Sequence, residues 1–150
     1  MKILIVEDDE NKRKAIANYI MQTFPKVEIK EANSYLSGVD MAMQYDFDLL
    51  LLDMSIPNFD GKDNKNSGEK LKNGGELIIQ ELLDEKIQFH CTIITQYETF
   101  NNESLESIDR RLKRICGNQY HGCIRYNTNN DQWKELLKNN IENVINSYCR

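Results

Sequence analysis

Three carboxylates and one hydroxyl stand where apolar runs of the sequence end. They are Glu7 and Asp8 after residues 3–6, Asp53 after residues 49–52, and Thr95 at the end of residues 91–95. Crowded carboxylates repel one another unless a cation lies among them, and oxygen ligands suit Mg²⁺. An Asp beside Mg²⁺ can act as a nucleophile toward a phosphoryl donor, and a Thr hydroxyl can donate a hydrogen bond to a phosphoryl oxygen. Taken alone, Asp53 equally fits a residue that closes a strand and begins a turn.

The apolar run 49–52 has no helical stripe and is typical of a strand in a parallel sheet covered on both faces. Pro57 prevents a simple continuation of that strand, so Asp53 is expected at its carboxyl end. Strands and helices alternate along the rest of the chain. The predicted strands are residues 3–6, 27–32, 48–52, 91–95 and 122–126. The predicted helices have the apolar faces Ile16/Tyr19/Ile20/Phe24, Leu36/Val39/Ala42/Met43, Leu77/Ile78/Leu82, Leu105/Ile108/Leu112/Ile115 and Trp133/Leu137/Ile141/Val144/Tyr148.

This alternation predicts a flavodoxin-like α/β fold, a (βα)5 doubly wound domain with a five-stranded parallel sheet in the order 2-1-3-4-5. In that order the first, third and fourth strands are neighbours at the topological switch point. Glu7, Asp8, Asp53 and Thr95 would then converge on one crevice.

A long loop is predicted between the third strand and the following helix, at about residues 58–75. Its central part, 62–73, is polar and contains Leu71 as a single large apolar residue. A structureless loop of this length is unusual in a compact domain and is either functional or mobile. The 150 residues are otherwise expected to form a single domain.

The composition argues against several classes of protein. A formal net charge of −5 disfavours a nucleic-acid binder, and we interpret the basic run 110–114 as the solvated face of a helix. The four cysteines lack C-x-x-C spacing and fit free thiols, and the two histidines have no companion at metal-ligand spacing. The N-terminal apolar run is too short for a signal peptide, and no run is long enough for a membrane helix. We therefore expect a soluble, cytoplasmic protein.

The motifs in this arrangement resemble those of the receiver domain of two-component response regulators, of the stand-alone, CheY-like kind. Val6-Glu7-Asp8-Asp9 is similar to the acidic pair, residues 52–61 to the phosphoacceptor strand and its loop, and Ile93-Ile94-Thr95 to the strand that ends in the switch hydroxyl. The resemblance spans nearly the whole chain.

The resemblance also implies roles for individual residues. Asp53 would be the phosphoacceptor and Thr95 the switch hydroxyl. Asp8, Asp53 and the backbone carbonyl of Ser55 would bind Mg²⁺ directly, and Glu7 would act mainly through water.

The sequence departs from the family pattern at the end of the fifth strand. Receivers usually have a Lys there followed by Pro, whereas Tyr126 and Asn127 occupy these places. Arg125 is the nearby cation, but strand alternation predicts that it points to the other face unless the strand bends. Cys123 replaces a common aromatic, and Gln96 replaces a small residue after the switch hydroxyl. Phosphate acceptance is expected to be intact, with a non-standard readout.

The leading hypothesis is a phosphoacceptor protein of a two-component phosphorelay that has no output domain and acts through a downstream protein. A histidine kinase or phosphotransfer protein would donate the phosphoryl group, and neither nucleic acid nor membrane would be a partner. No enzymatic turnover is expected beyond slow self-phosphorylation from small donors and autodephosphorylation. The alternative is a degenerate receiver that binds proteins independently of phosphorylation. A Mg²⁺-dependent phosphatase is a third hypothesis, opposed by Ser55 where a general-acid Asp would stand.

Overall fold

The computed structural model describes residues 1–61, 70–96, 99–100 and 102–148. Its centre is a five-stranded parallel sheet in the order β2-β1-β3-β6-β9, which confirms the predicted flavodoxin-like topology. The strands of this sheet are β1 (Lys2–Val6), β2 (Glu28–Ala32), β3 (Leu49–Leu52), β6 (His90–Thr95) and β9 (Tyr120–Arg125). Five α-helices are described: α1 (Glu10–Thr23), α2 (Tyr35–Gln44), α3 (Gly74–Asp84), α4 (Leu105–Cys116) and α5 (Gln132–Tyr148).

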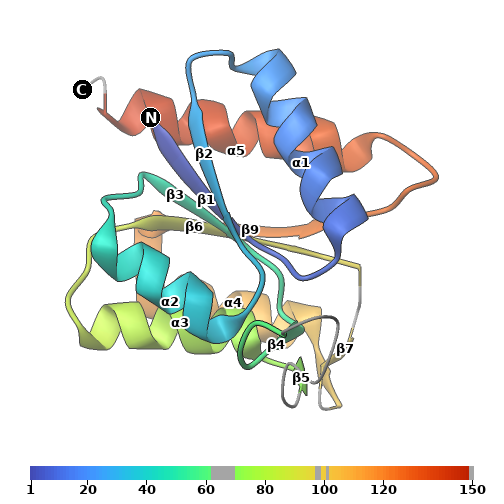
Figure 1. Cartoon of the computed structure of the whole chain (residues 1–150). Coiled ribbons are helices and arrows are strands. Elements are labelled where there is room, and N and C mark those ends of the chain that lie inside the picture. Colours follow the sequence, from blue (N-terminus) through green and yellow to red (C-terminus); the bar gives the residue numbers. More distant parts are fainter. Residues whose placement is uncertain (62–69, 97–98, 101, 149–150) are drawn as a thin grey trace.

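The helices cover both faces of the sheet, with α1 and α5 on one side and α2, α3 and α4 on the other (Figure 1). Successive residues of a strand point to opposite faces, so each central strand contributes to two cores. Leu50 and Leu52 pack with α2, α3 and α4, whereas Leu49 and Leu51 pack with α1 and α5. All four are buried, which explains why this stretch of sequence is continuously apolar.

Four residues of the predicted apolar helix faces are exposed instead: Leu36, Met43, Ile115 and Tyr148. Helix α2 approaches the sheet through Gly38, where an added Cβ would lie 3.0 Å from Val6 Cγ1, and through the buried Ala42. This contact turns Leu36 and Met43 outward. In α4 the inward stripe is Ile108 and Leu112, and Cys116 rather than Ile115 packs against the core.

Two short antiparallel strand pairs and a 3₁₀ turn accompany the main sheet. They are β4 (Ile56–Pro57) with β5 (Lys70–Leu71), β7 (Thr99–Phe100) with β8 (Glu103–Ser104), and the turn Gly117–Gln119. The first pair lies in the connection from β3 to α3, where the sequence predicts a loop without regular structure. Of the predicted loop core 62–73, residues 62–69 lie outside the described residues. No helix in the described parts of the chain is long and apolar enough to cross a membrane.

Gly75 allows the start of α3 to approach the end of β3. A Cβ at this position would lie 2.5 Å from the carbonyl oxygen of Asp53, which is backbone and has little freedom to move. The Gly75 N–H also donates a hydrogen bond to the carbonyl of Met54, at 3.2 Å. The glycine therefore fixes the position of the residue that follows β3.

We predict that Gly75→Ala destabilises the protein by about 1–2 kcal/mol, because backbone overpacking of about 1–3 kcal/mol exceeds the gain in helix propensity of at most about 1 kcal/mol. Gln80→Ala, at an exposed position of the same helix, is the matched control. Urea denaturation measures both variants, and an unchanged midpoint for Gly75→Ala would contradict the close approach.

A three-residue ion-pair network joins α3 to α4. Arg111 Nε lies 2.5 Å from Glu76 Oε2, and its Nη1 lies 2.6 Å from Glu103 Oε2. Glu76 is almost fully buried, whereas Glu103 is about one-third exposed. Hydrogen bonds from Arg111 and Ser107 lower the pKa of Glu103 to about 2.

Arg111→Gln should destabilise the protein by about 3 kcal/mol, since it leaves the buried Glu76 carboxylate without its cation. Arg110→Gln, an exposed change on the same helix, should have little effect. The part of this stabilisation that comes from the Arg111–Glu103 ion pair is present above pH about 4.5, the ordinary pKa of Glu. It is lost as the pH falls towards 2. Denaturation midpoints of both variants at pH 7 and pH 3 test this, and a difference that grows with acidity would refute the pairing of Glu103.

Candidate functional site

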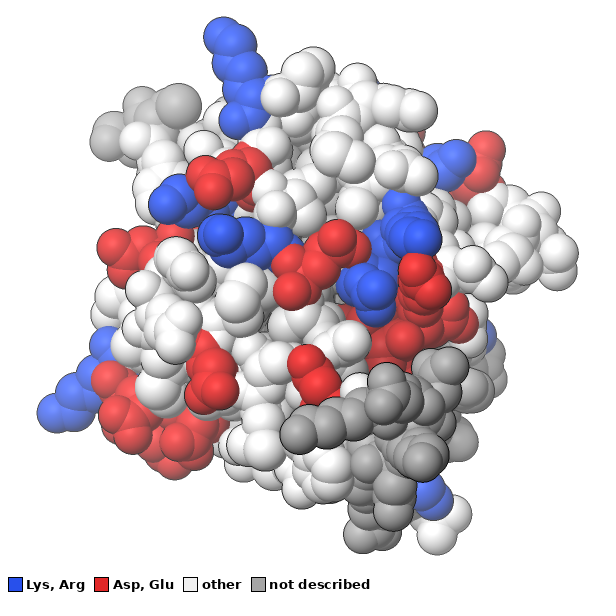
Figure 2. Space-filling model, in the orientation of Figure 1, with Lys and Arg blue, Asp and Glu red and all other residues white. Residues whose placement is uncertain are grey.

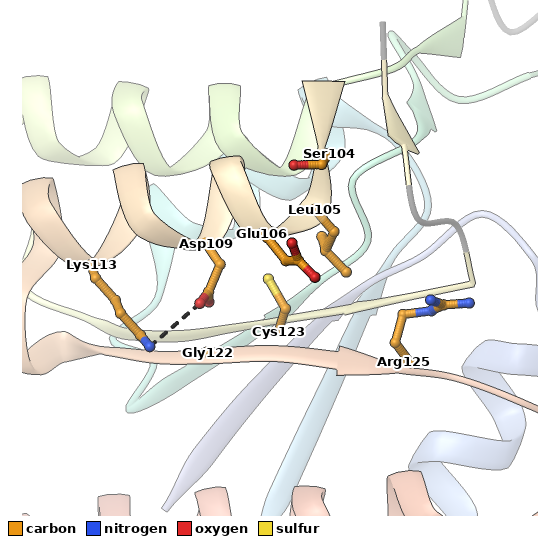
Figure 3. Close-up of a pocket in the computed structure, with 8 residues that line it drawn as sticks. All are labelled: Ser104, Leu105, Glu106, Asp109, Lys113, Gly122, Cys123 and Arg125. Atoms are coloured by element: carbon orange, nitrogen blue, oxygen red, sulfur yellow. Dashed lines mark ion pairs between the residues drawn. The ribbon is translucent and has the colours of Figure 1, made fainter. Parts of the chain in front are cut away.

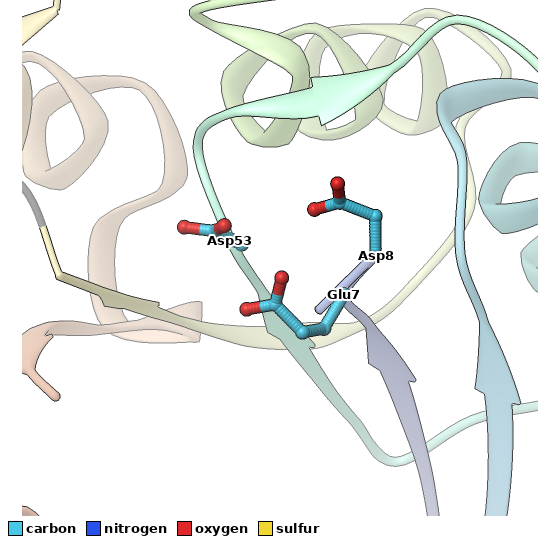
Figure 4. A group of neighbouring side chains, drawn as sticks. All are labelled: Glu7, Asp8 and Asp53. Atoms are coloured by element: carbon cyan, nitrogen blue, oxygen red, sulfur yellow. The ribbon is translucent and has the colours of Figure 1, made fainter. Parts of the chain in front are cut away.

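The carboxyl ends of β1 and β3 bring three carboxylates together. These strands are parallel neighbours with Val6 opposite Leu52, so the residues that follow them, Glu7 and Asp53, emerge side by side. One oxygen each from Glu7, Asp8 and Asp53 lies within 4.8 Å of the others (Figure 4). The convergence predicted for these three residues is thus present in the structure.

The Asp53 carboxylate is largely buried and held in one orientation. Its residue is 6% exposed, and its backbone N–H donates to the carbonyl of Val6 at 3.1 Å. The N–H of Met54 donates to Asp53 Oδ1 at 2.9 Å. A carboxylate fixed by its own strand in this way is preorganised for attack or for ligation.

Both oxygens of Glu7 are engaged by other groups of the protein. Oε1 forms an ion pair with Lys12 Nζ, and Oε2 accepts a hydrogen bond from the Asp9 N–H at 3.1 Å. Burial raises the pKa of Glu7 to about 8; Lys12 opposes this rise, and the nearby Asp53 carboxylate adds to it. Glu7 is therefore a poor direct ligand, in keeping with the indirect role that the family resemblance implies.

Asp8 is the most solvent-accessible of the three clustered carboxylates. Its side chain is 29% exposed and lies 3.5 Å from the ammonium of Lys70, which comes from β5. Asp9, the next residue, has a structural task instead, because its side chain caps α1 by accepting from the Lys12 N–H at 3.1 Å. The acidic run is thus divided by function, with Asp8 facing the cluster and Asp9 starting the helix.

Thr95 and Ser55 lie on the elements that flank Asp53. Thr95 is the last residue of β6 and is buried. Because Leu52 pairs with Ile93, Asp53 is level with Ile94, and Thr95 lies one residue further in the strand direction. Ser55 is half-buried, two residues after Asp53, in the turn that leads to β4. The switch role of Thr95 and metal ligation by the Ser55 carbonyl stay predictions.

At the end of β9, Arg125 and Tyr126 point to different faces, as strand alternation predicts. Arg125 is exposed, and its Nη2 donates to the carbonyl of Gln96 at 3.3 Å. Tyr126 is buried in the core beneath α1 and α5, and its N–H donates to the carbonyl of Thr95 at 2.8 Å. Its ring centroid lies 5.7 Å from Lys12 Nζ.

Lys12 is the residue of the site that the sequence analysis missed. It lies on α1, is 2% exposed, and its ammonium reaches Glu7, Asp53 and the backbone of β6. A signal was present in the sequence, because Lys12 precedes Ile16 and Ile20 by four and eight residues and so lies on the apolar stripe of its helix. A cation on a buried stripe indicates a buried anionic partner.

The donor set of the cluster fits a divalent cation bound through oxygen. Three carboxylates face two ammonium groups, one buried at Lys12 and one half-exposed at Lys70. Carboxylate oxygens that follow two adjacent strands, with Asp8 partly accessible, are the kind of ligands that Mg²⁺ prefers. Among the described residues no other group of three or more acidic, histidine or cysteine side chains has this spacing.

A hollow of about 580 Å³ lies between α4 and β9 (Figure 3). One of its two carboxylates, Asp109, accepts a hydrogen bond from the Tyr120 hydroxyl at 2.6 Å and lies 3.4 Å from Lys113 Nζ. Burial raises the pKa of the Cys123 thiol to about 12, which leaves it protonated and unreactive at neutral pH. The Asp109 charge is therefore paired with Lys113, and the thiol of this hollow is not a nucleophile.

The face of the molecule drawn in Figure 2 gives no support to nucleic-acid binding. Figure 2 shows acidic and basic side chains interspersed on one face of the molecule, and the described residues there form no broad basic patch. Protein–nucleic acid contacts require clustered positive charge. The carboxylate cluster is thus the feature of the described chain with the clearest chemistry.

Three known proteins resemble this chain in sequence or in structure. The Detocs response regulatory protein DtcB from Enterobacter cloacae is 28% identical over 145 residues, covering 92% of this chain and 97% of its own. The protein y4jR of Sinorhizobium fredii is 28% identical over 144 residues, covering 93% of this chain and 95% of its own. The response regulator TrrA of Thermotoga maritima, solved in complex with Mg²⁺-BeF, has a TM-score of 0.59 at 18% identity and covers 92% of this chain and 96% of its own.

Residues 3–109 match the response regulator receiver domain, a span that includes the acidic pair, Asp53 and Thr95. The parallel sheet, its strand order and the three carboxylates at the ends of β1 and β3 agree with that match. The chain belongs to the family of response regulator receiver domains.

Proposed function

We propose that the protein is a phosphoacceptor of a two-component phosphorelay, phosphorylated on Asp53 in a Mg²⁺-dependent reaction. The observation that carries the proposal is the cluster of Glu7, Asp8 and Asp53, in which Asp53 is buried and oriented by the Met54 N–H. The donor would be a phosphohistidine of a histidine kinase or phosphotransfer protein. An oxygen of Asp53 forms the new bond to phosphorus while the bond from phosphorus to the histidine nitrogen breaks.

The residues at the site have separable tasks in this proposal. Asp53 supplies the nucleophile, and Asp8 and Asp53, with the Ser55 carbonyl, would hold Mg²⁺. The metal would offset the negative charge shared by the carboxylates and the phosphoryl group. Glu7 would act indirectly, through its ion pair with Lys12. Thr95 would hydrogen-bond the transferred group from the end of β6.

Signalling through a separate protein is part of the proposal. The relative DtcB, named a response regulatory protein, is matched over 97% of its own length, which supports a signalling role for this chain. The target would be a downstream protein rather than nucleic acid. Slow self-phosphorylation from small donors and slow autodephosphorylation would be its own chemistry, and the protein would be cytoplasmic.

Asp53→Asn should abolish phosphoryl incorporation while the fold survives, because the amide keeps the shape of the side chain but lacks the attacking anionic oxygen. Intact mass after incubation with acetyl phosphate and Mg²⁺ measures incorporation, and circular dichroism checks the fold. Asp46→Asn is the control. Asp46 is exposed and precedes β3, at the opposite end of the strand from Asp53, so this variant should be labelled as strongly as wild type.

The same measurement distinguishes the alternatives. A stable gain of one phosphoryl group on wild type supports the phosphorelay role, and labelling of Asp53→Asn at the wild-type level would exclude Asp53 as acceptor. An unchanged mass would favour a phosphorylation-independent binding module. Rapid release of inorganic phosphate would favour a phosphatase.

Asp8→Asn should weaken Mg²⁺ binding by about tenfold or more, since it removes a negatively charged ligand of the metal. Asp9→Asn is the matched control, because it removes the same charge one residue away and keeps a good helix cap. Glu7→Gln should have a smaller effect than Asp8→Asn, since both Glu7 oxygens already have partners. Isothermal titration with MgCl₂ measures the three affinities, and equal losses for Asp8→Asn and Asp9→Asn would refute the assigned ligand.

A further inference from the structure

Lys12 places a buried ammonium directly beside the proposed phosphoacceptor. Its Nζ forms an ion pair with Glu7 Oε1, donates to the carbonyl of Ile94 at 2.9 Å, and lies 3.4 Å from Asp53 Oδ1. The residue is 2% exposed. Burying an ammonium costs several kcal/mol unless it is paired and hydrogen-bonded, so this position is maintained by specific partners.

The three contacts of the ammonium are unequal. A lysine ammonium has three N–H donors, and a charge-assisted bond to oxygen normally spans about 2.7–2.9 Å. Glu7 and Ile94 take two donors at close range, whereas Asp53 lies 3.4 Å away. The N–H donor that faces Asp53 therefore makes the weakest of the three contacts and can form a stronger hydrogen bond to a closer acceptor.

We propose that the Lys12 ammonium pairs with an oxygen of the phosphoryl group on Asp53, and so supplies from α1 the positive charge of the phosphorylated site. The inference rests on the proposed function and names a residue for it. Phosphorylation converts a carboxylate of charge −1 into an acyl phosphate that carries about −2 at neutral pH. Lys12 already contacts the accepting carboxylate, with its Nζ 3.4 Å from Asp53 Oδ1.

The end of β9 supports this placement of the charge. Arg125, the basic residue there, is directed to the carbonyl of Gln96 and is exposed. Tyr126 instead presents its ring to Lys12, with 5.7 Å between Nζ and the ring centroid. An aromatic ring attracts an ammonium at this distance, whereas a second ammonium would repel it. Lys12 and Tyr126 thus form a cation–π contact, in which α1 supplies the cation and the end of β9 supplies the aromatic ring.

Binding of beryllofluoride in the presence of Mg²⁺ tests the inference, because this phosphate mimic probes the phosphorylated state without turnover. Lys12→Met should lower the affinity for beryllofluoride by about ten- to a hundredfold, the loss expected for one charge-assisted hydrogen bond. Binding of Mg²⁺ alone should be unchanged or tighter, since the substitution removes a competing cation. Lys14→Met is the matched control, because Lys14 is an exposed lysine of the same helix, paired with Glu10 at 2.7 Å.

A rescue experiment separates a role at the phosphoryl group from a role in folding. The double variant Lys12→Met/Tyr126→Lys should recover at least part of the affinity for beryllofluoride, because it returns one ammonium to the site from the neighbouring strand. Lys12→Gln, which keeps a hydrogen-bond donor for Glu7 and Ile94 but has no charge, is the second variant if Lys12→Met folds poorly. It should show the same loss and the same rescue.

Three outcomes would overturn the inference. Equal beryllofluoride affinity in wild type and the Lys12 variants would reduce Lys12 to a structural ion pair with Glu7. Phosphoryl incorporation by wild type in EDTA, with dependence on Mg²⁺ appearing only in Lys12→Met, would show that the ammonium replaces the metal. A wild type that neither binds beryllofluoride nor gains a phosphoryl group would refute the proposed function itself, and this result is distinct from a loss confined to the Lys12 variants.

Discussion

Negative charge concentrated at the ends of two neighbouring strands is the constraint on which the site depends. Parallel pairing of β1 with β3 forces Glu7 and Asp53 together, and Asp8 joins them from the following turn. At these separations like charges in a partly buried site repel one another strongly. The surroundings of the cluster offset this repulsion with cations on two sides, Lys12 from α1 and Lys70 from β5.

The sheet and its order follow from features that are local in sequence. A continuous apolar run such as Leu49–Leu52 suits a strand covered on both faces, and alternation of strands with helical stripes requires parallel pairing with right-handed crossovers. Because the carboxyl ends of such strands lie on one edge, Glu7, Asp8 and Asp53 could be placed together from their positions alone. The backbone topology and the carboxylate cluster were therefore predictable without coordinates.

The features that were not predictable depend on contacts between distant parts of the chain. Exposure of Leu36 and Met43 follows from the rotation of α2, which is set by the fit of Gly38 against Val6. The strand pair β4–β5 joins Ile56–Pro57 to Lys70–Leu71 across a polar segment with no strand pattern. In each case the deciding contact joins residues far apart in the chain, which periodicity within one segment cannot reveal.

Lys12 shows how a local pattern and a distant contact combine. Its spacing from Ile16 and Ile20 marks it as inward-facing, but only the meeting of α1 with the ends of β1, β3 and β6 reveals what it faces. The ammonium joins Glu7 after β1, Asp53 after β3 and the Ile94 carbonyl in β6. Since it has three donors, any new oxygen that it contacts must displace or weaken one of these bonds.

The charge carried by Asp53 is consequently coupled to α1 and β6 through a single side chain. In the proposed phosphorylated state the ammonium gains an acceptor on the Asp53 side, and its bonds to Glu7 and Ile94 compete with that acceptor. Ile94 immediately precedes Thr95, whose carbonyl accepts the Tyr126 N–H at 2.8 Å, so a backbone hydrogen bond links this part of β6 to the end of β9. A lysine on β9 would tie the phosphoryl group to that strand directly, whereas Lys12 ties it to α1 and reaches β9 through the backbone of β6.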